Sequence, residues 1–117
     1  MTIEERISII EKALDDKKAS DITSIKVDEM TILTDYFVIC SAKSTTQVKA
    51  IADNVEEEMT KVGFEPAHKE GGAECRWIVL DYGDIIVHIF YDETRMLYAF
   101  DKLWENGKNV EKFVTED

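Results

Sequence analysis

The side chains in this sequence best suited to chemistry are two aspartates, Asp81 and Asp84, on either side of Tyr82-Gly83. Paired carboxylates can hold Mg²⁺ for nucleotidyl transfer, but such sites place them close together, often about two residues apart on one strand. Here the aspartates are three residues apart and span a turn. A magnesium-dependent nucleotidyltransferase-like enzyme is therefore only the alternative interpretation of this sequence.

Other catalytic patterns are weak. The stretch Cys40-Ser41-Ala42-Lys43-Ser44 has no Gly-Ser pair to open a helix, and the chain has no glycine-rich phosphate loop. His68 and His88 do not have the spacing of metal ligands. A Ser-His-Asp arrangement can assemble from distant positions, so the sequence leaves it open, but no pattern favours it. We predict no catalytic residue, no cofactor and no metal site.

The aspartates lie in a stretch, residues 77–90, with the pattern of a β-hairpin: two runs of β-branched and aromatic residues joined by a tight turn. If Tyr82-Gly83 is the loop, Asp81 faces Asp84 across the ladder. Side chains alternate between the two faces, and a one-residue slip would exchange the faces. This register predicts an aliphatic core face of Ile78, Leu80, Ile85, Val87 and Ile89, and a mixed face of Trp77, Val79, Asp81, Asp84, Ile86, His88 and Phe90.

The mixed face combines apolar anchors with charges, which is typical of a binding surface. Trp77, opposite His88 in this register, is the candidate anchor. Like charges directly opposite each other destabilise a ladder, so Asp81 and Asp84 need a basic side chain, solvent or a basic partner nearby. Acidic turns are common, and a solvated turn at the edge of a sheet is the alternative. A strand histidine such as His88 is more often packed or hydrogen-bonded than a base.

Size and charge narrow the class of protein. The chain has 117 residues, of which 44% are hydrophobic and 33% charged, as in a soluble globular protein. We expect a single domain over residues 1–117, with a polar tail from about residue 105. The formal net charge of -11 disfavours direct binding of DNA or RNA and suits a basic protein partner.

The expected compartment follows from the cysteines and from the missing targeting signals. Cys40 and Cys75 are not in a CxxC motif, which indicates a reducing compartment. No stretch approaches the roughly 20 apolar residues of a membrane span, and the first residues lack the basic and apolar regions of a signal peptide. We expect a cytoplasmic protein without a membrane partner.

The hydrophobic pattern predicts the α/β class, a single-domain mixed β-sheet flanked by helices. Helices are expected at residues 3–17, after Ser44 and from Asp92, and strands at 20–27, 35–40, 64–70 and in both arms of the hairpin. The run 35–40 is apolar throughout and should be central, whereas Pro66 places the run 64–70 at an edge. We expect the helices to cover the aliphatic face of the hairpin and to leave most of the mixed face to solvent or a partner.

The helix expected from Asp92 to Gly107 carries two further candidates, Arg95 and Tyr98. They lie three residues apart, off the apolar stripe that should be buried. That stripe comprises Met96, Leu97, Phe100, Leu103 and Trp104. Arg95 either forms a salt bridge with Asp92 or another nearby acid, or joins Tyr98 in the same partner surface as the hairpin.

Two blocks of residues match a pattern shared by a known family. The first comprises Thr34-Asp35-Tyr36-Phe37-Val38-Ile39-Cys40-Ser41-Ala42, Ser44, Gln47-Val48, Ala50-Ile51-Ala52-Asp53 and Val55-Glu56. The second comprises Glu70-Gly71, the stretch 77–90, Arg95, Tyr98 and Leu103-Trp104. With these blocks the sequence resembles the ribosomal silencing factor family, also called the Iojap family, in its bacterial form, over about residues 3–104. Residues 72–76 match no fixed pattern, and no contact is assigned to them.

The resemblance implies a nucleotidyltransferase-like fold without transferase activity. It implies binding to ribosomal protein fourteen of the large ribosomal subunit, at the face where the small subunit joins. Occupying that face would prevent joining and repress translation under nutrient limitation. The resemblance also implies a homodimer. The partner surface that it implies comprises Glu70, Trp77, Asp81, Tyr82, Asp84 and His88, with Arg95 and Tyr98 as further members.

Overall fold

The computed structural model describes residues 1–114 and is built on a six-stranded sheet with the strand order β3-β4-β5-β2-β1-β6. The strands are β1 (Ser20–Lys26), β2 (Tyr36–Ala42), β3 (His68–Glu70), β4 (Trp77–Asp81), β5 (Ile85–Tyr91) and β6 (Val110–Lys112). β2 and β5 pair in parallel, and the other neighbours pair antiparallel. The mixed sheet of the α/β class is therefore confirmed, with β2 near its centre and β3 at its edge.

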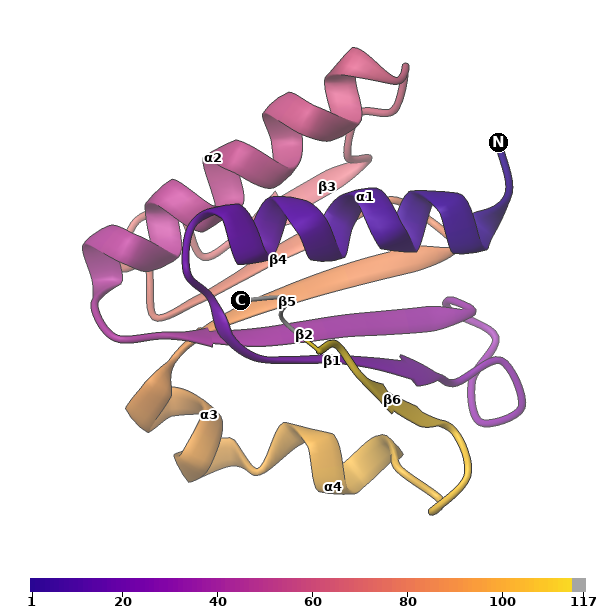
Figure 1. Cartoon of the computed structure of the whole chain (residues 1–117). Coiled ribbons are helices and arrows are strands. Elements are labelled where there is room, and N and C mark those ends of the chain that lie inside the picture. The colour runs from indigo at the N-terminus through magenta and orange to yellow at the C-terminus, as the bar shows by residue number, and fades with distance from the viewer. Residues whose placement is uncertain (115–117) are drawn as a thin grey trace.

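Helices cover both faces of this sheet, as Figure 1 shows. On one face lie α1 (Ile3–Asp16) and α2 (Thr45–Lys61), and on the other lie α3 (Asp92–Tyr98) and α4 (Phe100–Trp104). The expectation that all helices pack on the aliphatic face of the hairpin was therefore wrong. The chain needs both layers because its central strands are apolar on both sides.

The first core lies between the sheet and the helices α1 and α2. Ile7, Ile10 and Leu14 recur at helical spacing on α1, and their side chains are buried. The aliphatic face of the hairpin packs against them, as the sequence predicted: Ile78, Leu80, Ile85, Val87 and Ile89 all belong to this core. Fully burying an aliphatic side chain of this size contributes about 1.5–3 kcal/mol, so the layer is a main source of stability.

Helix α2 begins where the sequence placed its start. The Ser44 hydroxyl accepts a hydrogen bond from the backbone N–H of Gln47 at 3.0 Å. The Gln47 side chain accepts from the N–H of Lys43 at 2.8 Å rather than from the cap residue, so the capping box is only half formed. The helix ends before Gly63, whose φ of +91° is the left-handed conformation that glycine supplies at a C-terminus.

The hairpin register differs from the expected one. Trp77 pairs with Phe90 rather than His88, and Asp81 pairs with Ile86 rather than Asp84. The tip is Gly83-Asp84, because the N–H of Tyr82 still bonds to the carbonyl of Ile85 at 2.9 Å. Each residue of β4 thus faces a residue two positions further along β5 than expected. An even shift preserves the faces, which is why the core prediction survived the register error.

The third helix is broken, contrary to the expectation of one buried stripe. Ala99 has φ +49° and ψ 42°, a left-handed conformation that ends α3 and redirects the chain into α4. Met96, Leu97 and Leu103 of the expected stripe are 82%, 80% and 70% exposed. The break therefore turns apolar side chains outward that a continuous helix was expected to bury.

A second core fills the other face of the sheet. It comprises the buried residues Ile25, Val27, Phe37, Ile39 and Phe90, with Trp77, Ile86, Phe100, Trp104 and Val110 packed against them. The ring of Phe37 lies 5.4 Å from that of Phe100 and 4.9 Å from that of Trp104, centroid to centroid. Phe90 and His88 are buried here. The mixed face of the hairpin is consequently covered in large part by α3 and α4, not left open.

The polar segment after residue 105 contains a strand that the sequence did not predict. Val110 pairs with Ile25, which adds β6 as an edge strand beside β1. Phe113 is partly buried against the first core. Residues 115–117 of the expected tail lie outside the described part of the chain. None of the helices within residues 1–114 has the length and apolar character needed to cross a bilayer.

Candidate partner-binding surface

A groove of about 560 Å³ lies beside Trp77, between the loop before β4 and helix α3. Its lining comprises Gly71, Ala73, Glu74, Arg76, Trp77, Thr94, Leu97 and Tyr98. We call this surface the Trp77 groove. Leu97 and Tyr98 are exposed, and so is the adjacent Met96. Neighbouring large apolar side chains that are open to water mark a candidate interface.

The loop reaches this position because of Gly71. Its φ is +88°, and a Cβ there would lie 1.9 Å from the carbonyl oxygen of Trp77. The carbonyl of Gly71 also accepts the N–H of Cys75 at 3.0 Å, which closes the loop. Glycine is therefore required for the loop to pass this close to β4. No contact was assigned to residues 72–76 from the sequence, yet three of them line the groove.

Trp77 is held at the base of the groove by aromatic neighbours. Its ring stacks on Phe90 with centroids 4.7 Å apart, and lies 5.6 Å from Phe100. Tyr98 approaches it from the groove side at 5.4 Å. The indole N–H donates a hydrogen bond to Nδ1 of His88 at 3.0 Å. Trp77 is half-buried, so it has the amphipathic placement common in interface anchors.

His88 lies beneath Trp77 and does not reach the surface. Its side chain is 5% exposed, and burial lowers its pKa from 6.5 to about 3. The imidazole is therefore neutral at physiological pH. Because Nδ1 accepts from Trp77, the proton is assigned to Nε2, an atom that has no hydrogen-bond partner in the described part of the chain. In this structure His88 can reach a partner only through Trp77.

The aspartates of the hairpin are engaged within the protein. Asp84 accepts two hydrogen bonds from Arg6 of α1, at 2.8 and 2.5 Å. The hydrogen bonds and charge of Arg6 hold the pKa of Asp84 below its usual value. Asp81 accepts from the N–H of Gly83 at 2.8 Å. Asp84 is therefore stabilised by a nearby basic side chain, as the sequence suggested. Asp81 is stabilised by a backbone N–H of the turn.

Arg95 is an internal residue, not an exposed one. Its guanidinium contacts Asp101 at 2.7 Å and Ser41 at 2.9 Å, and donates to the carbonyl of Asp21 at 2.8 Å. The salt bridge is thus made to an acid of α4 rather than to Asp92. Arg95 lowers the pKa of Asp101 although burial acts to raise it. Its role in the free protein is to hold the broken helix on the sheet.

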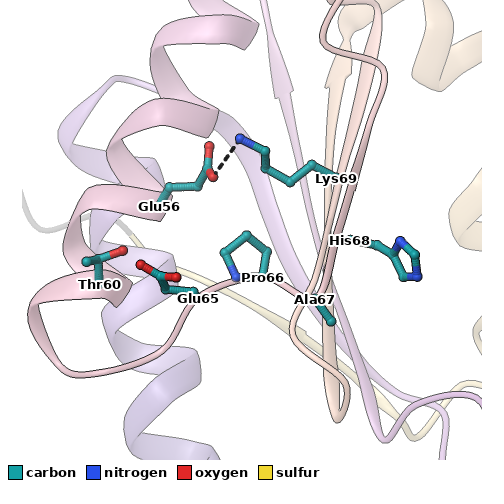
Figure 2. Close-up of a pocket in the computed structure, with 7 residues that line it drawn as sticks. All are labelled: Glu56, Thr60, Glu65, Pro66, Ala67, His68 and Lys69. Carbon is teal, nitrogen blue, oxygen red and sulfur yellow. Dashed lines mark ion pairs between the residues drawn. The ribbon is translucent and has the colours of Figure 1, made fainter.

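A second depression, of about 470 Å³, lies between α2 and the segment before β3 (Figure 2). It is lined by Glu56, Thr60, Glu65, Pro66, Ala67, His68 and Lys69. The ion pair from Lys69 to Glu56, 3.0 Å, crosses it, and His68 points away from it. Within residues 1–114 no three His, Cys, Asp or Glu side chains cluster as metal ligands would. This depression offers solvated charges without apolar anchors.

The residues singled out from the sequence thus fall into separate places. Trp77 and Tyr98 meet at the Trp77 groove, and Glu70 is exposed next to Gly71 of its loop. Asp81, Tyr82 and Asp84 lie around the tip of the hairpin, at the far end of β4. Burial raises the pKa of Tyr82, whose buried hydroxyl has no hydrogen-bond partner among residues 1–114. The groove residues that sequence reasoning missed as site residues are Ala73, Glu74, Arg76, Thr94 and Leu97.

The charged side chains that line the groove are one acid, Glu74, and one base, Arg76, and both are exposed. Two further exposed acids, Glu70 at the end of β3 and Glu93 of α3, are next in sequence to the lining residues Gly71 and Thr94. A groove with apolar side chains inside and charged side chains at its edge suits a protein partner that offers an apolar anchor. The fold and this surface define a small α/β domain suited to protein recognition.

The family is shown by comparison with known proteins. The model of the family described as ribosomal silencing factor during starvation matches residues 1–117, and the chain belongs to this family. The resemblance noted in the sequence is confirmed. The names of its members indicate a regulatory, ribosome-associated factor rather than an enzyme.

Three relatives illustrate the match. The ribosomal silencing factor of Halalkalibacterium halodurans is 33% identical over 111 residues, 95% of each chain. A mouse protein named mitochondrial assembly of ribosomal large subunit protein 1 is 33% identical over 84% of this chain and 44% of its own. A crystal structure of a Chromobacterium violaceum protein superposes with a TM-score of 0.87 at 29% identity, over 98% of this chain and 95% of that one.

Proposed function

We propose that this chain binds the large ribosomal subunit through ribosomal protein fourteen and thereby blocks the joining of the small subunit. It acts in the cytoplasm, lowers translation when nutrients are limiting, and needs neither catalysis nor a cofactor. Family membership supports the ribosomal role, and the name of the mouse relative refers to the large subunit of the mitochondrial ribosome. The observation that carries the proposal for this chain is the Trp77 groove.

The groove has the features expected of a surface that binds a basic protein. Leu97 and Tyr98 supply exposed apolar area beside Trp77, the residue type most often found at binding hot spots. The exposed Glu74 in its lining can pair with a basic side chain of a ribosomal protein. The net charge of -11 repels the RNA phosphates that surround such a protein, which favours the protein partner over the RNA.

The mechanism is steric and requires only occupancy. A factor that covers the docking face excludes the small subunit whenever its concentration exceeds its dissociation constant. An interaction of about -8 kcal/mol corresponds to a dissociation constant of about 1 μM, which is within reach of a small interface with a few anchors. We also propose that the free protein forms a homodimer, in which a second copy can cover the same exposed side chains.

Co-sedimentation with purified large subunits tests the proposal. The protein should pellet with large subunits and should reduce the number of whole ribosomes formed when small subunits are added. Leu97→Ala should weaken binding by about 1–2 kcal/mol if Leu97 is an anchor. Leu33→Ala is the matched control, because Leu33 is 76% exposed against 80% for Leu97 but lies in the β1–β2 loop.

Each outcome bears on a different part of the proposal. Equal binding by the two leucine variants and the parent would show that the groove is not the docking surface. Absence of binding by the parent would contradict the ribosomal mechanism itself. In that case, magnesium-dependent nucleotide turnover that is lost in Asp81→Asn would support the enzymatic alternative.

A further inference from the structure

We infer that His88 is a positioning residue, which fixes the indole of Trp77 in the orientation that forms the base of the Trp77 groove. The inference rests on the proposed function of this groove as the partner surface. It goes further in assigning a binding role to a side chain that is only 5% exposed. The assignment rests on three features of the geometry.

The first feature is the hydrogen bond itself. Trp77 Nε1–H donates to His88 Nδ1 at 3.0 Å, and both residues lie on the same face of the β4–β5 hairpin. Their strand positions are diagonal, since Val79 is the residue that pairs with His88. The indole must therefore lean along the strand to reach the imidazole. If the Trp77 side chain adopts a rotamer that does not lean this way, the hydrogen bond to His88 is lost.

The second feature is the surroundings of His88, which fix its ring. Phe37 of β2 meets it edge-on with centroids 4.9 Å apart, and Phe100 of α4 lies 4.4 Å away. Its Nε2 has no hydrogen-bond partner within residues 1–114. The imidazole is clamped between rings, and Nδ1 is its one atom with a hydrogen bond among those the structure describes.

The third feature is the cost of losing the acceptor. A half-buried indole N–H without a partner loses its hydrogen bond with water and gains none in return. The ring of Trp77 would then rotate to bring the N–H to solvent, away from Phe90 and Tyr98. Part of the binding free energy of a partner would then be used to return the Trp77 ring to its original orientation, which lowers affinity. His88 thus contributes preorganisation, although it is buried.

Two variants separate this role from simple packing. Asn places its carbonyl oxygen close to the position of Nδ1, so His88→Asn keeps an acceptor but leaves a void and a buried amide. Leu has nearly the same shape near the backbone, so His88→Leu keeps apolar packing but removes the acceptor. If His88 serves only to fill the core, His88→Leu should be more stable than His88→Asn and should bind large subunits at least as well. If it positions Trp77, the leucine variant is the weaker binder.

The test combines a signal from the indole with ribosome binding. In ¹⁵N-labelled protein the indole N–H resonance of Trp77, assigned by its absence in Trp77→Phe, should exchange slowly with solvent in the parent and in His88→Asn. In His88→Leu it should exchange faster, and binding to large subunits should weaken roughly three- to tenfold, the effect of one hydrogen bond. A protected indole N–H in His88→Leu, or binding that falls only in His88→Asn, would overturn the inference.

A titration of the unaltered protein gives an independent answer that needs no variant to fold. The charged groups that face His88 are Asp101 of α4 and its partner Arg95 of α3, while Phe37 and Trp77 face it from β2 and β4. The indole signal should stay constant from about pH 7 to about pH 5. Protonation of Nδ1 removes the acceptor, so the indole signal should change only where His88 itself titrates. An indole signal that does not respond while the His88 imidazole becomes protonated would overturn the inference. If the parent did not bind large subunits, the proposed function would fail, and the indole signal would still decide the positioning role.

Discussion

Arg6 of the first helix holds Asp84 at the tip of the hairpin through two hydrogen bonds, although 78 residues separate them in sequence. The guanidinium also lies 4.9 Å above the ring of Phe64. Only 11% of the Arg6 side chain is exposed, so most of its charge is removed from water. The pair ties α1 to the point where β4 turns into β5. It also supplies the compensating cation that the acidic turn required.

Asp84→Asn should lower the free energy of unfolding, because it leaves the charge of Arg6 largely buried without a counterion. We expect a loss of about 1–2 kcal/mol, at the low end for a broken buried pair because the Asp84 side chain is 35% exposed and screened by water. Chemical denaturation at neutral pH measures it. The control is Asp81→Asn, since an asparagine oxygen can still accept from the N–H of Gly83. Equal losses in the two variants would contradict the role given to Arg6.

Local periodicity explains what the sequence predicted well. Ile7, Ile10 and Leu14 on α1, and the alternation through the hairpin, are patterns that a few neighbouring residues determine. Such patterns fix which face is buried without fixing the partner across the sheet. This is why the faces of the hairpin were predicted correctly while its register was not.

Contacts between distant residues explain what the sequence could not predict. No glycine or proline marks the break at Ala99, and the break is stabilised by tertiary contacts. In a continuous helix, Arg95 and Asp101 would lie on different faces, but the break lets them pair at 2.7 Å. Leu97 was therefore assigned to the core, and the most exposed part of the groove was missed. Trp77 and Tyr98, by contrast, do lie together at the groove, with ring centroids 5.4 Å apart, and their part in partner binding stays a prediction.

Ala99→Gly should stabilise the protein. Alanine in the left-handed region carries a steric cost of about 1–2 kcal/mol, whereas glycine adopts this conformation freely. Part of the gain is offset because glycine makes the unfolded chain more flexible. We therefore expect the free energy of unfolding, measured by thermal denaturation, to rise by about 0.5–1 kcal/mol. Ala50→Gly, at an exposed position within α2, should lose about 1 kcal/mol. A loss in both variants would show that Ala99 is not strained.

His88 should make stability depend on pH. Burial lowers its pKa from 6.5 to about 3. Below pH 6.5 the unfolded chain binds a proton at His88 that the folded protein does not bind. The free energy of unfolding therefore falls as the pH drops from 6.5 to about 3. For one proton the slope approaches about 1.4 kcal/mol per pH unit. Denaturation at several pH values should give a flatter dependence for His88→Leu. Parallel curves for parent and variant would show that His88 is protonated alike in both states.

Gly71→Ala should damage the groove without touching its apolar side chains. The added Cβ would lie 1.9 Å from the carbonyl oxygen of Trp77, and the φ of +88° disfavours any side chain. The loop must then move away from β4, and we expect a loss of about 2 kcal/mol or more in unfolding free energy together with weaker binding to large subunits. Gly72→Ala is the neighbouring control, because a Cβ there meets no atom within 4 Å. Near-parent stability and binding in Gly71→Ala would mean that the loop can leave β4 at little cost and that its close approach does not shape the groove.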